Sequence, residues 1–228
     1  MVVNMQGPDT RLYRSELRQR QAAETRRRVV AAAGEVFSRN GYQAATFAQI
    51  ADRAGVSIET VRSHGPKSAL MWAAVEVASF GVEGDIDVFQ TGVGAALTKI
   101  HDPDALAVFL GETMLAINEP VAGVWTAVTG AAHGDAELRG HLRDRLAGMR
   151  SQIGQVLHWI AGQGWLRTDV PFDDLVETCC ILTSVETYVR FVHLDGGTPD
   201  RYKAFVARTV RDTMLVAGVG FEPTTSGL

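Results

Sequence analysis

FSRNGYQAATFAQIADRAGVSIETVRSHGPKSAL, residues 37–70, is the stretch of sequence that decides the fold. Thr46 and Gln49 have the spacing of a capping box, in which each side chain binds the other residue's backbone N–H at the start of a helix. Gly55 ends that helix, and Ser57 caps a further short helix. The stretch therefore predicts two short helices joined by a tight glycine turn.

Apolar residues recur at helical spacing along most of the chain, and the short β-branched runs lack the turn residues of hairpins. The predicted fold class is all-α, with an N-terminal three-helix helix-turn-helix domain followed by a larger helical domain. Gly, Pro and Asp mark the ends of its helices. The predicted helices are residues 9–40, 46–54, 58–64, 66–78, 102–117, 120–132, 135–163, 171–193 and 199–216, with a partly irregular stretch over residues 79–101.

Two of these helices have a recognisable apolar face. The face of the first predicted helix contains Ala22, Val29, Val30, Ala33 and Phe37. The longest helix of the second domain has an apolar stripe whose members alternate steps of three and four residues, namely Leu138, Leu142, Leu146, Met149, Ile153, Leu157 and Ile160. We expect the face of the first helix to pack against the core.

The composition is that of a globular protein, with 46% hydrophobic and 21% charged residues. No run of eighteen apolar residues occurs, and the N-terminus is polar and basic, so the sequence predicts a cytoplasmic protein without a membrane span or secretory signal. Cys179 and Cys180 are adjacent and lie among apolar residues. We expect buried, inert thiols and no disulfide.

Charge is distributed unevenly along the chain. Residues 1–70 hold eleven of the 22 Lys and Arg residues but six of the 26 Asp and Glu residues, which leaves eleven basic and twenty acidic residues in the remainder. The N-terminal part therefore carries a net charge of +5 and the remainder −9. This asymmetry indicates that the N-terminal part meets a polyanion.

The positions of three small or apolar residues fit a helix-turn-helix. Ala51 lies where the two helices would cross, Gly55 supplies the turn, and Val61 would anchor the second helix to the core. With Val61 inward, the opposite face of the second helix is exposed and fits the major groove of DNA, where side chains distinguish bases.

Two kinds of DNA contact are expected from this motif. Arg62 is the best candidate for reading a base, whereas Thr46, Ser57 and Lys67 lie in the first turns of helices and are expected to hold phosphates. The full predicted set of DNA-contacting residues is Thr46, Ser57, Ile58, Glu59, Thr60, Arg62, Ser63, His64 and Lys67.

Residues 25–70, with this motif at their centre, resemble the DNA-binding domain of the tetracycline-repressor (TetR) family. The resemblance implies a homodimer on a palindromic double-stranded operator and a helical ligand-binding and dimerisation domain. It also implies release from DNA when a small-molecule effector, partly hydrophobic, binds. The chain departs from the family at Arg62, where an aromatic residue is usual, and at Gly65, where the family has Phe after a His.

The resemblance also implies that the last two predicted helices, residues 171–193 and 199–216, form a four-helix bundle with their partners. Its expected members are Cys179, Leu182, Val185, Val189, Phe205, Thr209 and Met214.

The predicted domain organisation has four parts: a basic extension (1–20), the helix-turn-helix domain (21–65), the helical ligand-binding and dimerisation domain (66–217) and a disordered tail (218–228). The basic residues before the motif are Arg11, Arg14, Arg18, Arg20, Arg26, Arg27 and Arg28. They either lie along DNA, in a minor groove or on the backbone, or form a solvated helix face.

Candidate ligand-binding residues combine apolar bulk with a few polar groups: Phe109, Thr113, Met114, Trp125, His158 and Trp159. Neither a metal nor another cofactor is expected, because no His, Cys or acidic spacing fits one, and no catalytic motif predicts an enzyme. The functional prediction is a sequence-specific transcriptional regulator, a repressor released by a ligand. The alternative is a DNA-binding dimer without an inducer, in which the second domain serves only dimerisation.

Overall fold

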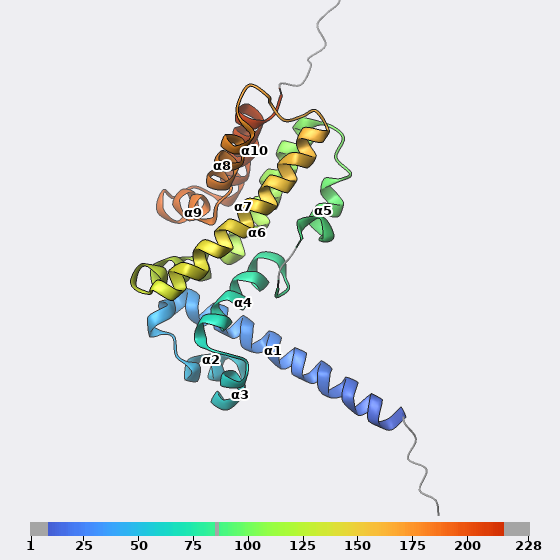
Figure 1. The fold of residues 1–228 in the computed structure, drawn as a ribbon. Helices are drawn as coiled ribbons and strands as arrows, with labels where there is room; N and C mark the ends of the chain where they lie inside the picture. The colour runs from blue at the N-terminus through green and yellow to red at the C-terminus, as the bar shows by residue number, and fades with distance from the viewer. Residues whose placement is uncertain (1–8, 85–86, 217–228) are drawn as a thin grey trace, which may run out of the picture.

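The computed structural model describes residues 9–84 and 87–216, and within these ranges all the regular elements are helices (Figure 1). The predicted all-α class is confirmed. The helices are α1 (Asp9–Ala44), α2 (Phe47–Ala54), α3 (Ile58–Ser63), α4 (Lys67–Phe80), α5 (Gly92–Leu97), α6 (Pro103–Gly134), α7 (Ala136–Gly162), α8 (Phe172–Leu182), α9 (Val185–Tyr188) and α10 (Pro199–Met214). A 3₁₀ turn at Val88–Gln90 precedes α5, and a π-helical turn at Val189–Leu194 follows α9.

Helix α1 is long, and its N-terminal half extends away from the rest of the molecule (Figure 1). Val29, Val30 and Phe37 from its other half are buried with no exposed surface, as their spacing predicted. Ala22 is exposed, and its predicted burial was wrong, because it lies on the half that extends outward. The backbone leaves helical geometry at Gly41 (φ 72°), close to the predicted end.

Helix α6 is the centre of the packing and contacts α1, α4, α7, α9 and α10. Two of its glycines lie against neighbouring helices. A Cβ atom at Gly111 would lie 2.6 Å from the carbonyl oxygen of Lys203 on α10, and one at Gly123 would lie 2.8 Å from Cβ of Ser38 on α1. Helices α1 and α10 therefore approach α6 closely because these positions lack a side chain.

The prediction of separate helices at residues 102–117 and 120–132 was wrong, because α6 continues through Pro120. Proline removes one backbone hydrogen bond and normally bends or ends a helix. Buried Asn118 and Val121 on either side of it are held in the core. Packing against several helices thus offsets the local preference for a break.

The prediction of one helix over residues 171–193 was also wrong. Helix α8 ends at Leu182 and α9 begins at Val185, where the Ser184 hydroxyl accepts a hydrogen bond from the Thr187 N–H (3.2 Å). The Asn118 side-chain amide of α6 donates to the carbonyl oxygen of Thr183 (2.9 Å) and to the Tyr202 hydroxyl (2.8 Å). The break is stabilised because the buried Asn118 amide binds the Thr183 carbonyl oxygen, which the helix no longer satisfies.

In the described part of the chain, α6 is the one helix that is long and apolar enough to cross a membrane by length and composition. The sequence predicted no such span. In the structure α6 packs against α1, α4 and α10.

Replacing Gly111 with Ala is expected to lower the free energy of unfolding by about 1–3 kcal/mol, because the added Cβ would collide with the α10 backbone. Gly130→Ala on the same helix is the matched control. No atom lies within 4 Å of a Cβ there, and alanine favours a helix over glycine by about 0.5–1 kcal/mol. Urea denaturation of both variants measures the difference, and equal stabilities would contradict a close approach of α6 and α10.

Candidate nucleic-acid interface and ligand pockets

Helices α2 and α3 are fixed by local hydrogen bonds that the sequence encodes. The Thr46 hydroxyl accepts from the Gln49 N–H (3.2 Å), and the Gln49 side-chain oxygen accepts from the Thr46 N–H (2.9 Å). Gly55 has the left-handed conformation of the predicted turn (φ 64°), and Val61 is buried without exposed surface. The two helices therefore have the arrangement expected of a helix-turn-helix.

The face of α3 opposite Val61 is open to solvent. Ile58, Glu59, Arg62 and Ser63 are exposed, and Thr60 is half-buried. The Ser57 hydroxyl accepts from the Thr60 N–H (3.1 Å) and so caps the helix. The structure thus brings most of the predicted base-reading residues onto one short, capped helix.

Arg62 is oriented by a neighbouring aromatic ring. Its guanidinium carbon lies 5.9 Å from the centroid of the Phe47 ring, at the start of α2. A guanidinium over an aromatic face is attracted by the ring's quadrupole and still keeps its N–H donors at the edge. The contact places the Arg62 guanidinium beside the start of α2 and leaves its N–H donors available.

Lys67 makes contacts within the protein. Its ammonium donates to the carbonyl oxygens of Tyr42 (2.7 Å), Ala45 (3.1 Å) and Gln43 (3.5 Å), and it lies 4.4 Å from the Tyr42 ring centroid. Partial burial lowers the pKa of Lys67 below its usual value. These contacts fasten the start of α4 to the end of α1, and they favour a structural role over the predicted phosphate contact.

His64 is the C-cap of α3 and is half-buried. Its carbonyl oxygen accepts a hydrogen bond from Arg26 on α1 (2.6 Å). The same guanidinium forms a two-pronged ion pair with Glu83, with Nε 3.1 Å and Nη2 2.6 Å from the same carboxylate oxygen. Arg26, which the sequence grouped with a DNA-contacting arm, therefore joins α3 to the loop after α4.

The six candidate ligand-binding residues do not meet in one site. Phe109 and Thr113 of α6 line a pocket of about 560 Å³ against α4 and α5. Trp125 instead donates from Nε1 to the Glu186 carboxylate of α9 (2.8 Å), and the His158 ring lies 4.1 Å from that of Phe172. The remaining two, Met114 and Trp159, are half-buried and pack against the core.

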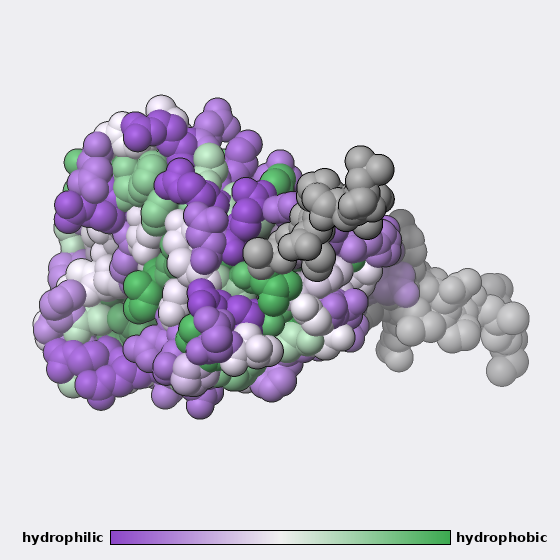
Figure 2. All heavy atoms as spheres, turned by 90° about the horizontal axis from the view of Figure 1, so that it is seen from above, coloured by the Kyte–Doolittle hydropathy of each residue, from purple (hydrophilic) through white to green (hydrophobic). Residues whose placement is uncertain are grey.

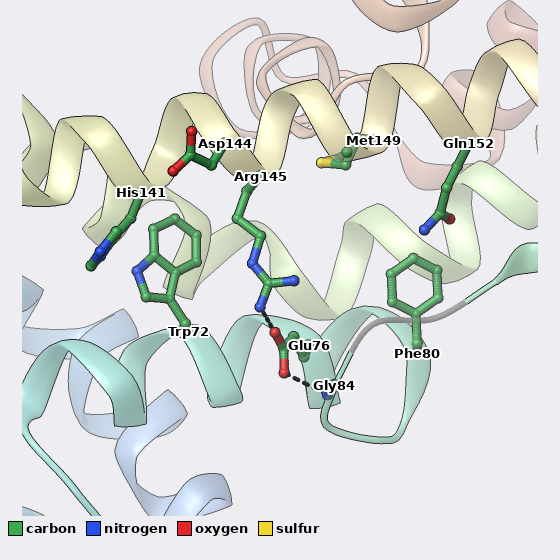
Figure 3. Close-up of a pocket in the computed structure, with 10 residues that line it drawn as sticks. Trp72, Glu76, Phe80, Gly84, His141, Asp144, Arg145, Met149 and Gln152 are labelled. Atoms are coloured by element: carbon green, nitrogen blue, oxygen red, sulfur yellow. Dashed lines mark hydrogen bonds and ion pairs between the residues drawn. The ribbon is translucent and has the colours of Figure 1, made fainter.

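A second pocket, of about 450 Å³, lies between α4 and α7 (Figure 3). The sequence prediction missed it. Its wall consists of Trp72, Glu76, Phe80, Gly84, His141, Asp144, Arg145, Gly148, Met149 and Gln152. One signal lay in the apolar stripe of α7, because Leu146 and Met149 at its middle are exposed beside this pocket, at 44% and 40%.

Glu76 is an acid of this α4–α7 pocket with little contact with solvent, since its side chain is only 13% exposed. One carboxylate oxygen forms an ion pair with Arg145 of α7, and the other accepts from the Gly84 N–H (2.8 Å), as Figure 3 shows. On the same wall, Nε1 of Trp72 is buried and has no hydrogen-bond partner among the described residues. The pocket thus contains a paired buried acid and an unpaired buried donor.

The two thiols are poor nucleophiles in this fold. Burial raises the pKa of Cys179 to about 12 and also raises that of Cys180. Within residues 9–84 and 87–216, no group of three His, Cys, Asp or Glu side chains could hold a metal ion.

Three of the residues expected in a dimer interface are buried within the single chain. Leu182, Val185 and Met214 pack into its own core, which leaves little of their surface for contact with a partner. Helices α8 and α10 instead expose other side chains, including Ile181, which is 67% exposed.

The comparisons with known proteins support the assignment of the fold. Residues 29–64 match the family described as bacterial regulatory proteins, tetR family. A structure from Saccharomonospora viridis, described as a transcriptional regulator in complex with choline, is 20% identical, with a TM-score of 0.65 over 86% of this chain and 100% of that one. No curated protein matches the chain.

Two further structures are similar over most of their length. The SmeT–triclosan complex is 17% identical, with a TM-score of 0.64 over 90% of this chain and 97% of that one. NalD of Pseudomonas aeruginosa, described as the secondary repressor of the MexAB-OprM multidrug efflux pump, is 16% identical, with a TM-score of 0.60 over 85% and 98%.

A helix-turn-helix followed by a larger all-helical part is the architecture of a class of transcriptional regulators. The comparisons make this more specific and agree with the resemblance found in the sequence: residues 29–64 match the tetR family, and the chain has the fold of solved TetR-family transcriptional regulators.

Lys67→Met is expected to lower the free energy of unfolding by about 1–3 kcal/mol, because three carbonyl oxygens lose a charged donor. Lys99→Met, at an exposed position after α5, is the control and should change stability by less than about 0.5 kcal/mol. Thermal and urea denaturation of both variants test this. Unchanged stability with uniformly weaker DNA binding would instead restore the phosphate contact predicted from the sequence.

Proposed function

We propose that this chain is a sequence-specific DNA-binding transcriptional regulator, a repressor that a small molecule releases from its operator. One observation carries the DNA-binding part: the exposed face of α3, capped by Ser57 and anchored by Val61, within the tetR-family match. A short helix with one buried anchor and one solvent-facing polar face is the shape that enters a major groove.

In the proposed complex, α3 lies in the major groove and Arg62 reads a base edge. A guanidinium donates two parallel hydrogen bonds to guanine, which makes Arg the commonest base reader. Glu59 and Ser63 lie on the same exposed side of the helix, and Thr46 and Ser57 are exposed at the starts of α2 and α3. We assign phosphate contacts to Thr46 and Ser57.

We propose a homodimer formed through α8 and α10. Two large apolar side chains near this end of the chain are mostly exposed: Ile181 of α8 at 67% and Leu194, in the turn after α9, at 71%. Figure 2, which views the molecule from above, shows patches of hydrophobic residues between hydrophilic ones. A dimer would bury such patches and place two α3 helices on successive major grooves, about 34 Å apart.

The effector part of the proposal rests on α4 and the two pockets. Helix α4 begins at Lys67, beside α3, and ends at Phe80, which lines both pockets. Its 14 residues span about 21 Å, so a ligand at one end can shift the other. Similar structures were obtained with choline and with triclosan, and NalD is described as a repressor, which supports a ligand-released repressor here.

The basic residues before the motif remain part of the proposed DNA interface, except Arg26 and Arg27, which are paired within the chain. Helix α1 runs through residue 20 without a break, and Arg27 is paired with Glu24 while Arg26 is held by Glu83. Residues 1–8 of the extension and the predicted tail at 218–228 lie outside the described residues. We propose that the basic arm lies along the DNA backbone or enters an adjacent minor groove.

DNA affinity falls as salt concentration rises, and the slope of this fall on logarithmic axes reports the number of phosphates that the protein neutralises. Deleting residues 1–20 is expected to make the slope shallower, by about one unit for each phosphate that the arm neutralises. Titrations of both proteins at several salt concentrations measure the slopes. The same slope for both proteins would remove the arm from the interface and leave it as a solvated helix face.

The test of DNA recognition is a fluorescence-anisotropy titration against DNA from upstream of the chain's own gene, with scrambled DNA beside it, at physiological salt. The upstream fragment should bind at least about a thousandfold more tightly. Arg62→Ala should reduce this preference by about 1–3 kcal/mol, because the variant has no side chain to read that base.

Arg150→Ala, at an exposed position on α7, is the matched control and should leave the preference unchanged. Equal binding of both fragments by the wild-type protein would contradict sequence-specific regulation through that operator. Specific binding that no small molecule changes would support the alternative of a dimer without an inducer.

A further inference from the structure

The lining of the α4–α7 pocket favours a positively charged organic ligand. Its charged side chains are two acids, Glu76 and Asp144, and one base, Arg145, so the acids are in excess. Trp72 and Phe80 add aromatic surface (Figure 3). Carboxylates and aromatic faces both attract an organic cation, and the aromatic rings also pack against its apolar body.

In this pocket, such a ligand would compete with Arg145 for the Glu76 carboxylate. A carboxylate that is only 13% exposed needs a cationic partner, because little water remains to solvate it. Its present partner, Arg145, reaches it from α7 across the pocket, and the Arg145 side chain is 38% exposed (Figure 3). A cation in the pocket can therefore take the place of Arg145 at small cost in desolvation.

Glu76 is also the first member of a series of contacts that ends at α3. Its second oxygen holds the Gly84 N–H at 2.8 Å, and the neighbouring Glu83 forms the ion pair with Arg26. Arg26 in turn donates to the carbonyl oxygen of His64, the C-cap of α3, at 2.6 Å. These contacts connect the pocket to the recognition helix without passing along α4.

We propose that the α4–α7 pocket binds an organic cation with an aromatic or apolar body, whose charged group replaces Arg145 as the partner of Glu76. The exchange moves the Glu76 carboxylate, loosens its hold on Gly84, and so shifts Glu83, Arg26 and the end of α3. This inference deepens the proposed function and rests on it for the DNA step, whereas the binding step is measurable without DNA.

The binding step is tested on the full-length chain by calorimetry with benzylguanidinium and with benzylurea, its neutral analogue of nearly the same shape. Benzylurea keeps an oxygen that could accept from the Trp72 N–H, so a preference for benzylguanidinium reports the charge. We expect a preference of about tenfold or more, as for other charge-paired ligands. Equal affinities, or no binding of either compound, would overturn the proposal.

Three variants locate the cation. Glu76→Gln should abolish the preference for benzylguanidinium, whereas Arg145→Gln should strengthen binding severalfold, because the competing guanidinium is gone. Glu112→Gln, which alters the acid of the other pocket, is the matched control and should behave as wild type. A preference that is absent in Glu112→Gln and kept in Glu76→Gln would place the cation in the other pocket and refute the assignment.

The connection to α3 is tested by the ratio of DNA dissociation constants with and without saturating benzylguanidinium. For the wild-type protein we expect about tenfold or more, within the usual range of allosteric coupling. Glu83→Gln should bind the cation normally but bring the ratio close to one, because Arg26 is no longer held. Glu24→Gln removes a surface ion pair of α1 outside this series and should keep the full ratio.

The outcomes separate the two proposals. A protein that binds benzylguanidinium through Glu76 but never prefers its upstream DNA would contradict the proposed function and leave the pocket assignment standing. A protein that binds its DNA specifically, with full coupling in Glu83→Gln, would refute the contact series and leave the DNA-binding proposal standing.

Discussion

The close packing of α6 against both α1 and α10 is the constraint on which the arrangement of the molecule depends. Gly111 and Gly123 allow two backbones to approach one helix from different sides. Because α1 also contributes to the core beneath α2 and α3, the helix-turn-helix and the larger helical part share a single packed interior. The helix-turn-helix and the larger helical part are thus joined by one core, so a change of packing in one reaches the other.

Features set by neighbours in the sequence were predictable. The capping box at Thr46 and the left-handed Gly55 depend on contacts within a few residues, and the inward position of Val61 follows from the helical repeat; each is where the sequence placed it. Features set by distant partners were not. Pro120 predicted a helix end because proline lacks an N–H, yet the packing around α6 keeps the helix intact. Asn118 gave no sign that it would pair with the carbonyl of Thr183, 65 residues further on.

The same distinction applies to the candidate sites. The exposed face of α3 follows from one buried residue and a helical repeat, so its members could be named from the sequence. Glu76 and Arg145 lie on helices that are neighbours only in the folded chain, and nothing in either local sequence identifies the other. Lys67 illustrates the same point, since a cation in a first helical turn suits phosphate, and nothing in the local sequence indicated that this one donates to carbonyl groups at the end of α1.

Phe80 closes α4 and forms part of the wall of both pockets. The two pockets therefore share this residue, and a ligand that displaces Phe80 in one of them also changes the wall of the other. A substitution at Phe80 would alter both at once and could not assign a ligand to either, whereas Met149 belongs to one cavity alone and Phe109 to the other.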